Sequence, residues 1–154
     1  HLQHKSITDL SQFDNESVDV IYASHVIEYF DRDEFKNVLC EWRRVLKIGA
    51  TLRLAVPDFE SMSRLYNDNK ITLQDIIGPL YGKMLMGEQT IYHKMVYDYS
   101  TLKDLLLECD MRNVRLYDWQ KTEHCNFDDH SQAYIPHMDK QNGTLISLNI
   151  ECDK

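Results

Sequence analysis

The chain has 154 residues, of which 43% are hydrophobic, and a formal net charge of −8; this is the size of a single domain, and we take residues 1–154 as one. The negative charge argues against a nucleic-acid partner, because affinity for phosphates comes mainly from Lys and Arg. No apolar run is long enough to cross a bilayer and the N-terminus lacks the apolar core of a signal peptide, so we expect a soluble, cytoplasmic protein with no membrane contact.

The first predicted elements are a strand and a helix. Residues 19–25 form a short, mostly apolar run after the turn-forming residues 14–17, which indicates a buried strand. Asp31 then favours a helix start, because it is a good N-cap residue and Glu34 can complete a capping box. Apolar side chains follow at helical spacing and are expected to pack in the core: Phe35, Val38, Leu39, Trp42, Val45 and Leu46.

The helix is expected to end at Gly49, which readily adopts the left-handed conformation of a C-cap. Residues 51–56 are the next predicted strand, which Pro57 stops. The following stretch, 59–97, is less regular, and we interpret it as an insertion over the sheet. Short helical pieces are expected in it at 61–66 and 72–77.

The second half predicts one more helix and two strands. Ser100 is expected to cap an amphipathic helix, which is followed by a strand at 114–119. A polar loop at 120–143 then leads to a final strand at 144–151. Strands that alternate with helices in this way are typical of an open α/β sheet, in which ligands bind outside the carboxyl ends of the strands.

Two sequence blocks resemble the second half of class I S-adenosylmethionine-dependent methyltransferases. Residues 19–29 read DVIYASHVIEY and residues 41–58 read EWRRVLKIGATLRLAVPD. Asp9-Leu10 precedes them as in that family, and a weaker match continues to the C-terminus. The resemblance implies an α/β, partial Rossmann-like methyltransferase fold, which is a three-layer, mostly parallel sheet. In that fold the last strand, here 144–151, runs antiparallel between its neighbours.

The glycine-rich half of that fold has no counterpart in this sequence. Its cofactor-binding turn needs closely spaced glycines, and the five glycines here never form such a group: Gly49, Gly78, Gly82, Gly87 and Gly143. Smaller departures are Tyr29 in place of a His and Ala50 in place of a Gly. The resemblance therefore implies a truncated form, and we expect this chain alone to bind S-adenosylmethionine weakly or not at all.

Five residues are assigned to cofactor binding by the resemblance. Ala23, Ser24 and His25 close a strand at the mouth of the sheet, where the methionine part of the cofactor would lie. Glu28 could orient this pocket, and Ser6 stands where an acidic residue would meet the adenine amine. The alternative for Ser24 and His25 is that they only cap the next helix, and for Glu28 that it only favours a helix N-terminus through the dipole.

Both long connections, 59–97 and 120–143, lie where this fold builds its acceptor specificity. His93 and His130 are the candidate catalytic bases, because His titrates near neutral pH, although a single His is more often structural. Asp58, Tyr92 and Tyr97 are the candidate substrate-binding residues, and Asp58 could equally cap the helix that follows it. No metal is expected, because the spacing of four polar residues matches no standard zinc site: His124, Cys125, His130 and His137.

The implied function is methyl transfer from S-adenosylmethionine to a small-molecule or glycan-type acceptor. The alternative is a cofactor-less, methyltransferase-like binding or regulatory module, which the missing glycine-rich turn favours. A nucleotide-using enzyme of another kind is disfavoured, because no phosphate-cradling loop is present. The strand at 18–23 lacks its usual neighbour, so we expect a homo-oligomer through this exposed edge unless residues 1–13 cover it.

Overall fold

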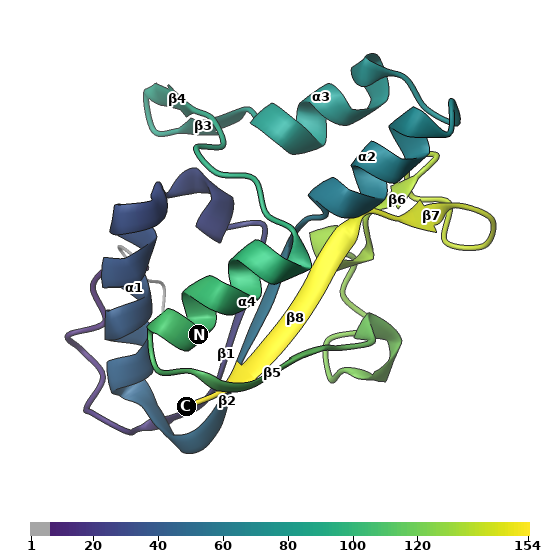
Figure 1. The fold of residues 1–154 in the computed structure, drawn as a ribbon. Coiled ribbons are helices and arrows are strands. Elements are labelled where there is room, and N and C mark those ends of the chain that lie inside the picture. The colour runs from purple at the N-terminus through teal and green to yellow at the C-terminus, as the bar shows by residue number, and fades with distance from the viewer. Residues whose placement is uncertain (1–6) are drawn as a thin grey trace.

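A four-stranded sheet with the order β1-β2-β8-β5 forms the centre of the computed structural model, which describes residues 7–154 (Figure 1). β1 (Val18–Ser24) runs parallel to β2 (Leu46–Pro57). β8 (Ser147–Asp153) lies between β2 and β5 (Arg112–Leu116) and is antiparallel to both. The expected α/β sheet with an antiparallel last strand is therefore confirmed. Ser6, which was assigned to cofactor binding, lies outside the described residues.

Two helices cover one face of this sheet (Figure 1). They are α1 (Arg32–Val45) and α4 (Tyr99–Glu108), and both turn an apolar side to the strands. Alternate strand residues share that core with residues of both helices: Leu52, Leu54, Val56 and Ile150 from the strands, Phe35, Leu39 and Trp42 from α1, and Leu102 and Leu106 from α4. Each large apolar side chain buried in this way contributes about 1.5–3 kcal/mol.

The other face of the sheet is mostly polar, and within residues 7–154 no α-helix covers it (Figure 1). The intervening residues of each strand point to it, because successive side chains alternate across a sheet. The ring of Tyr22 stacks on His124 with a centroid distance of 3.9 Å, and Asn149 Nδ2 donates to the Ser131 carbonyl at 2.8 Å. Residues 117–132 therefore lie over the part of this face that contains Tyr22 and Asn149. Elsewhere on the same face, Arg53 pairs with Glu151 at 2.9 Å.

The capping box predicted at the start of α1 is present. The Asp31 side chain accepts from Asp33 N and Glu34 N, and the Glu34 side chain accepts from Asp31 N. The predicted end at Gly49 is wrong, because α1 ends at Val45 and β2 begins at once with Leu46. Gly49 has φ +78° inside β2, where the pairing with β1 slips and extra residues must be accommodated.

The predicted cap of α4 is also wrong by two residues. Asp98 is the N-cap, and its carboxylate accepts from Thr101 N at 2.7 Å. An Asp binds the free amides of a first turn at least as well as a Ser, so the helix starts at the earlier residue. The predicted final strand divides into two: β7 (Thr144–Leu145) pairs with β6 (Tyr134–Ile135), and only β8 joins the main sheet.

The insertion at 59–97 lies over the carboxyl ends of β1 and β2 (Figure 1). It consists of α2 (Phe59–Asn67), α3 (Leu73–Tyr81) and a hairpin of β3 (Met84–Met86) and β4 (Gln89–Ile91) that the sequence did not predict. Met62, Leu65 and Ile76 pack with Ile146 in a small second core. Within residues 7–154, no helix is both long and apolar enough to span a membrane.

Candidate functional site

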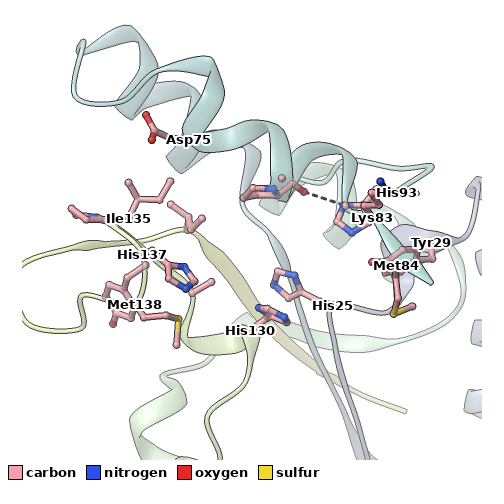
Figure 2. Close-up of a pocket in the computed structure, with 17 residues that line it drawn as sticks. His25, Tyr29, Asp75, Lys83, Met84, His93, His130, Ile135, His137 and Met138 are labelled. Carbon is pink, nitrogen blue, oxygen red and sulfur yellow. Dashed lines mark hydrogen bonds between the residues drawn. The ribbon is translucent and has the colours of Figure 1, made fainter. Parts of the chain in front are cut away.

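A cavity of about 580 Å³ lies between the end of β1, helix α3 and the segment around β6 (Figure 2). Pockets of about 300–1,000 Å³ are typical for small-molecule ligands. Polar groups reach it from all three segments, and among the lining residues are His25, Tyr29, Lys83, His93, His130 and His137. The fold thus gathers imidazole rings from distant parts of the chain at the edge of the sheet where α/β proteins bind ligands.

His25 occupies a strained position directly after β1. Its φ of +51° is in the left-handed region, which is uncommon for a residue other than glycine. Its amide nitrogen still donates to the Ala55 carbonyl at 2.8 Å, so the pairing with β2 holds the backbone there. The ring is turned toward His130, with ring centroids 4.9 Å apart. Backbone strain of this kind persists only where surrounding contacts enforce it, and it is frequent at functional sites.

Glu28 lies directly behind these rings, with only 1% of its side chain exposed. Within residues 7–154 neither carboxyl oxygen has a hydrogen-bond partner. Oε1 is 3.4 Å from His25 Nδ1 and 3.8 Å from His93 Nε2. Burial raises the pKa of Glu28 to about 8, because a carboxylate loses its hydration there. The carboxyl group is therefore largely protonated at neutral pH.

The imidazole of His93 is held by contacts on several sides. Its Nδ1 is 3.0 Å from the Pro79 carbonyl oxygen, which fixes the proton on Nδ1 and leaves Nε2 unprotonated. The ring meets the edge of Tyr29 at a centroid distance of 4.7 Å. The next two backbone amides, of Lys94 and Met95, donate to the Glu28 carbonyl at 2.8 and 3.2 Å.

Burial keeps two of the imidazoles neutral. The pKa of His25 is lowered to about 3, first by burial and then by the nearby rings of His130 and His93. Burial also lowers the pKa of His93, against the opposing effect of hydrogen bonds to the backbone of Pro79 and Leu80. His130 differs in being exposed at the cavity wall. The site therefore combines two exposed imidazoles, of His130 and His137, with two neutral ones that are shielded from solvent and with a protonated carboxyl group.

Ser24 lies on the polar face of the sheet and is held by Asp129. Its Oγ donates to Asp129 Oδ1 at 3.4 Å, and the Tyr22 hydroxyl donates to Oδ2 at 2.8 Å. Ser131 N completes the set with a hydrogen bond of 2.7 Å to Oδ1. Burial alone would raise the pKa of Asp129, but the hydrogen bonds from Ser131 and Tyr22 lower it below its usual value. The segment 120–143 is thereby tied to the end of β1.

The sequence did not single out Asp129 as a functional residue. Asp129 is the N-cap of the short 3-10 helix His130–Gln132. Asp is a preferred N-cap residue, and this local preference is the only signal in the sequence that could have drawn attention to it. Its long-range partners, Tyr22 and Ser24, leave no comparable trace in the sequence.

The other predicted residues lie apart from the cavity lining. Asp58 caps α2, where its carboxylate accepts from Glu60 N at 3.1 Å and Ser61 Oγ at 2.6 Å. Tyr92 is 51% exposed, and Tyr97 is 1% exposed with no partner for its hydroxyl among the described residues. Ala23 is buried in the core under the helices. Of the predicted site residues, His25, His93 and His130 line the cavity and Glu28 stands behind them.

Residues 7–154 contain no group of three or more His, Cys, Asp or Glu side chains placed to hold a metal ion. The four residues considered for zinc are divided between two places. His124 stacks on Tyr22 over the polar face, whereas His130 and His137 line the cavity.

Comparisons with known proteins identify the fold. Residues 1–54 match the family model of a methyltransferase domain, which is about a third of the chain. Among solved structures, a SAM-dependent methyltransferase from Methanosarcina mazei matches with a TM-score of 0.56 and 20% identity over 97% of this chain and 65% of its own. One from Archaeoglobus fulgidus matches with a TM-score of 0.56 and 15% identity over 99% and 66%. No curated protein matches.

A third structure is described as a possible histamine N-methyltransferase from Thermotoga maritima. It matches with a TM-score of 0.56 and 16% identity, over 97% of this chain and 62% of its own. The chain thus spans less than two thirds of the length of each of these structures. The expected resemblance is confirmed. The chain has the fold of the part of class I S-adenosylmethionine-dependent methyltransferases that it covers, and its first 54 residues match the methyltransferase domain.

Proposed function

We propose that this chain forms the acceptor-binding side of an S-adenosylmethionine-dependent methyltransferase that acts on a small-molecule or glycan-type acceptor. The observation that carries the proposal is the cavity at the carboxyl end of β1, which is lined by four imidazoles from distant segments, those of His25, His93, His130 and His137. The match of residues 1–54 to the methyltransferase domain and the likeness of fold support it.

The described residues fit only part of the cofactor. The end of β1 offers the Ser24 hydroxyl and the strained backbone of His25. Three buried polar atoms next to this strand end have no hydrogen-bond partner among the described residues, as expected beside a polar ligand: His25 Nε2 and the two Glu28 carboxyl oxygens. The glycine-rich turn that would hold the rest of the cofactor is absent from the 154 residues. We therefore propose that this chain alone binds S-adenosylmethionine weakly or not at all.

When bound, S-adenosylmethionine supplies a methyl group on a positively charged sulfur, which the nucleophilic atom of the acceptor attacks in line. The residues of this chain would orient the acceptor and take up its proton. His130 is exposed at the cavity wall and can approach an acceptor directly, while the nitrogens of His93 already face Pro79 and Glu28. The apolar side chains of Met84, Ile135 and Met138 would pack against the body of the acceptor.

The test is transfer of a labelled methyl group. The gene product that contains these residues is incubated with methyl-labelled S-adenosylmethionine and panels of small hydroxyl, amine and glycan compounds. We expect label in one chemical class of acceptor, with an equal amount of S-adenosylhomocysteine formed. Formation of S-adenosylhomocysteine with no labelled acceptor, or no turnover with any panel, would count against the proposal.

A binding or regulatory module without cofactor is the second candidate, and the missing glycine-rich turn favours it. Calorimetric titration separates the two. If the gene product binds compounds of the panel but not S-adenosylmethionine, the chain is a methyltransferase-like binding module. Binding of S-adenosylmethionine with low-micromolar affinity to the isolated 154 residues would overturn the expectation that the cofactor site is incomplete here.

A further inference from the structure

The carboxyl group of Glu28 is the least explained polar group in the structure. It is buried, and its two oxygens lack hydrogen-bond partners among residues 7–154. An unsatisfied buried carboxyl group costs stability, since even a neutral polar group without a partner costs about 1–3 kcal/mol. The fold nevertheless fixes this residue firmly, because its carbonyl accepts hydrogen bonds from two successive amides, Lys94 N and Met95 N. A costly group held so firmly points to a role other than packing.

The imidazoles of His25 and His93 both lie next to this carboxyl group. His25 Nδ1 lies 3.4 Å from Oε1 on one side, and His93 Nε2 lies 3.8 Å from the same oxygen on the other. His93 carries its proton on Nδ1, toward the Pro79 carbonyl, so its Nε2 offers a lone pair to Glu28. The other ring nitrogen of His25, Nε2, is buried and has no hydrogen-bond partner within residues 7–154, and the ring itself lines the cavity. The row of His25, Glu28 and His93 thus leads from the cavity into the interior of the protein.

We propose that His25 and Glu28 form the acid–base pair of this site, in which His25 Nε2 receives the proton that leaves the acceptor and Glu28 holds the proton released from Nδ1. This inference rests on the proposed function and adds a catalytic residue, His25, and a residue that acts through it, Glu28. His93 Nε2 faces the carboxyl group from the other side, 3.8 Å from Oε1.

The proposed step balances in charge and atoms. The lone pair of the acceptor atom forms the new bond to the methyl carbon, and the carbon–sulfur bond breaks with its electron pair left on sulfur. The acceptor proton binds His25 Nε2 while the Nδ1 proton passes to the Glu28 carboxylate. The ring is neutral before and after, and the negative charge of the carboxylate disappears together with the positive charge on the sulfur of the methyl donor.

The order of the two pKa values favours this direction. Burial lowers the pKa of His25 to about 3 and raises that of Glu28 to about 8, so the proton rests on the carboxyl group rather than on the ring. In a hydrolase triad the carboxylate stays ionised and only orients the histidine. Here the buried carboxyl is the stronger base, and a base whose pKa lies near the working pH is effective in proton transfer.

Other titratable groups around the pair come from each neighbouring element. His130 faces His25 from the segment before β6, and Tyr29 follows Glu28 in the same turn. His93 and Tyr97 approach from the segment after β4, and the charge of Glu28 raises the pKa of Tyr97 in addition to burial. The nearest cation in sequence, Lys94, turns its ammonium away to Glu34 at 2.7 Å. No lysine or arginine side chain is paired with Glu28 among the described salt bridges.

The test is spectroscopic and needs no cofactor. Nuclear magnetic resonance of the 15N-labelled chain follows the ring nitrogens of His25 and His93 between pH 5 and 9, and infrared spectroscopy follows the protonated carboxyl band. We expect the His25 ring to stay neutral at pH 5 and both rings to report one transition near pH 8, where the carboxyl band disappears. Glu28→Gln should remove the band and the transition, and Glu34→Gln, which changes an exposed carboxyl group, should leave both.

The outcomes are decisive in either direction. A His25 ring that becomes imidazolium near pH 6.5, or a Glu28 carboxyl already ionised at pH 6, would overturn the pair. The wild-type titration alone gives this answer if Glu28→Gln fails to fold. In the gene product, turnover should rise with pH through about 8 and lose that rise in Glu28→Gln. If the spectroscopic transition appears but no methyl transfer is found, the proposed function fails while the proton exchange within the pair stands.

Discussion

The imidazole of His93 occupies the space that a side chain on Gly82 would need. A Cβ at Gly82 would lie 2.4 Å from His93 Nε2 and 2.5 Å from Cδ2. The backbone of Gly82 is also in a conformation, φ +53° and ψ 176°, that is essentially restricted to glycine. The position of the His93 ring beside Glu28 therefore depends on the absence of a side chain at Gly82.

Gly82→Ala should displace the His93 ring as well as strain the backbone. Gly87→Ala is the matched control, because Gly87 also has a positive φ, +62°, but a Cβ there meets nothing within 4 Å. We expect a loss of about 1–2 kcal/mol for the control, from backbone strain alone, and a larger loss for Gly82→Ala. Only Gly82→Ala should change the ring resonances of His93. Unchanged His93 resonances in that variant would show that the position of the ring does not depend on Gly82.

The stability of the chain should fall with rising pH between about 6.5 and 8 because of Glu28. Its pKa is raised in the folded state from 4.5 to about 8, so its contribution is fully present below 4.5 and is lost as pH rises through 8. His25 has the opposite slope up to its unfolded pKa of 6.5, so the two oppose each other below that value.

Urea denaturation should therefore show a loss on the order of 2 kcal/mol across that window, which Glu28→Gln should abolish. The same fall in Glu28→Gln as in the wild type would assign the effect to another group.

Asp129→Ala should loosen the segment that is tied to the end of β1. The substitution leaves the hydroxyls of Tyr22 and Ser24 and the amide of Ser131 without their common acceptor. We expect a loss of about 1–3 kcal/mol in chemical denaturation, with faster amide exchange at 130–132. Asp128→Ala is the control, since Asp128 is exposed and pairs only with Lys140, and it should cost less than about 0.5 kcal/mol. Equal effects of the two variants would contradict this account.

Self-association through the free edge of β1 remains a prediction. Within residues 7–154, β1 pairs only with β2, while the segment before β1 is held against α1 by bonds such as Trp42 Nε1 to the Ile7 carbonyl at 2.8 Å. Light scattering should show dimers or larger species that Val20→Lys reduces, because a charge on an edge strand opposes pairing. Ile48→Lys, at a still more exposed apolar residue on β2, should not. A clean wild-type monomer with fast amide exchange along β1 would refute the prediction.

The sequence predicted those elements whose signals are local. The capping box at Asp31 and the apolar spacing of α1 fixed that helix start, and the resemblance placed the antiparallel last strand correctly. The helix ends were less certain, because Gly49 serves a bend inside β2 that only the pairing with β1 explains. The β3–β4 hairpin was missed because each strand has three residues, too few to show a period.

The candidate site could be predicted only in part, for the same reason. His25, His93 and His130 were singled out one by one. They line one cavity only because the sheet, the insertion at 59–97 and the segment around β6 bring them together. Asp58 illustrates the opposite outcome, because its local capping role takes up the carboxylate that was considered for the acceptor. The role of Asp129 and the position of the His93 ring beside Gly82 arise from contacts between separate segments, which leave no pattern in the sequence.

Steady-state methyl transfer by the gene product, compared between wild type, His130→Ala and His137→Ala, tests the central claim most directly. Both histidines line the cavity, but only His130 lies against His25. The account predicts that His130→Ala lowers turnover by about 10²-fold or more, as expected when the exposed imidazole that would orient the acceptor beside His25 is lost, with the affinity for S-adenosylmethionine unchanged and His137→Ala close to wild type. Unchanged turnover in His130→Ala, or an equal loss of cofactor affinity, would contradict it.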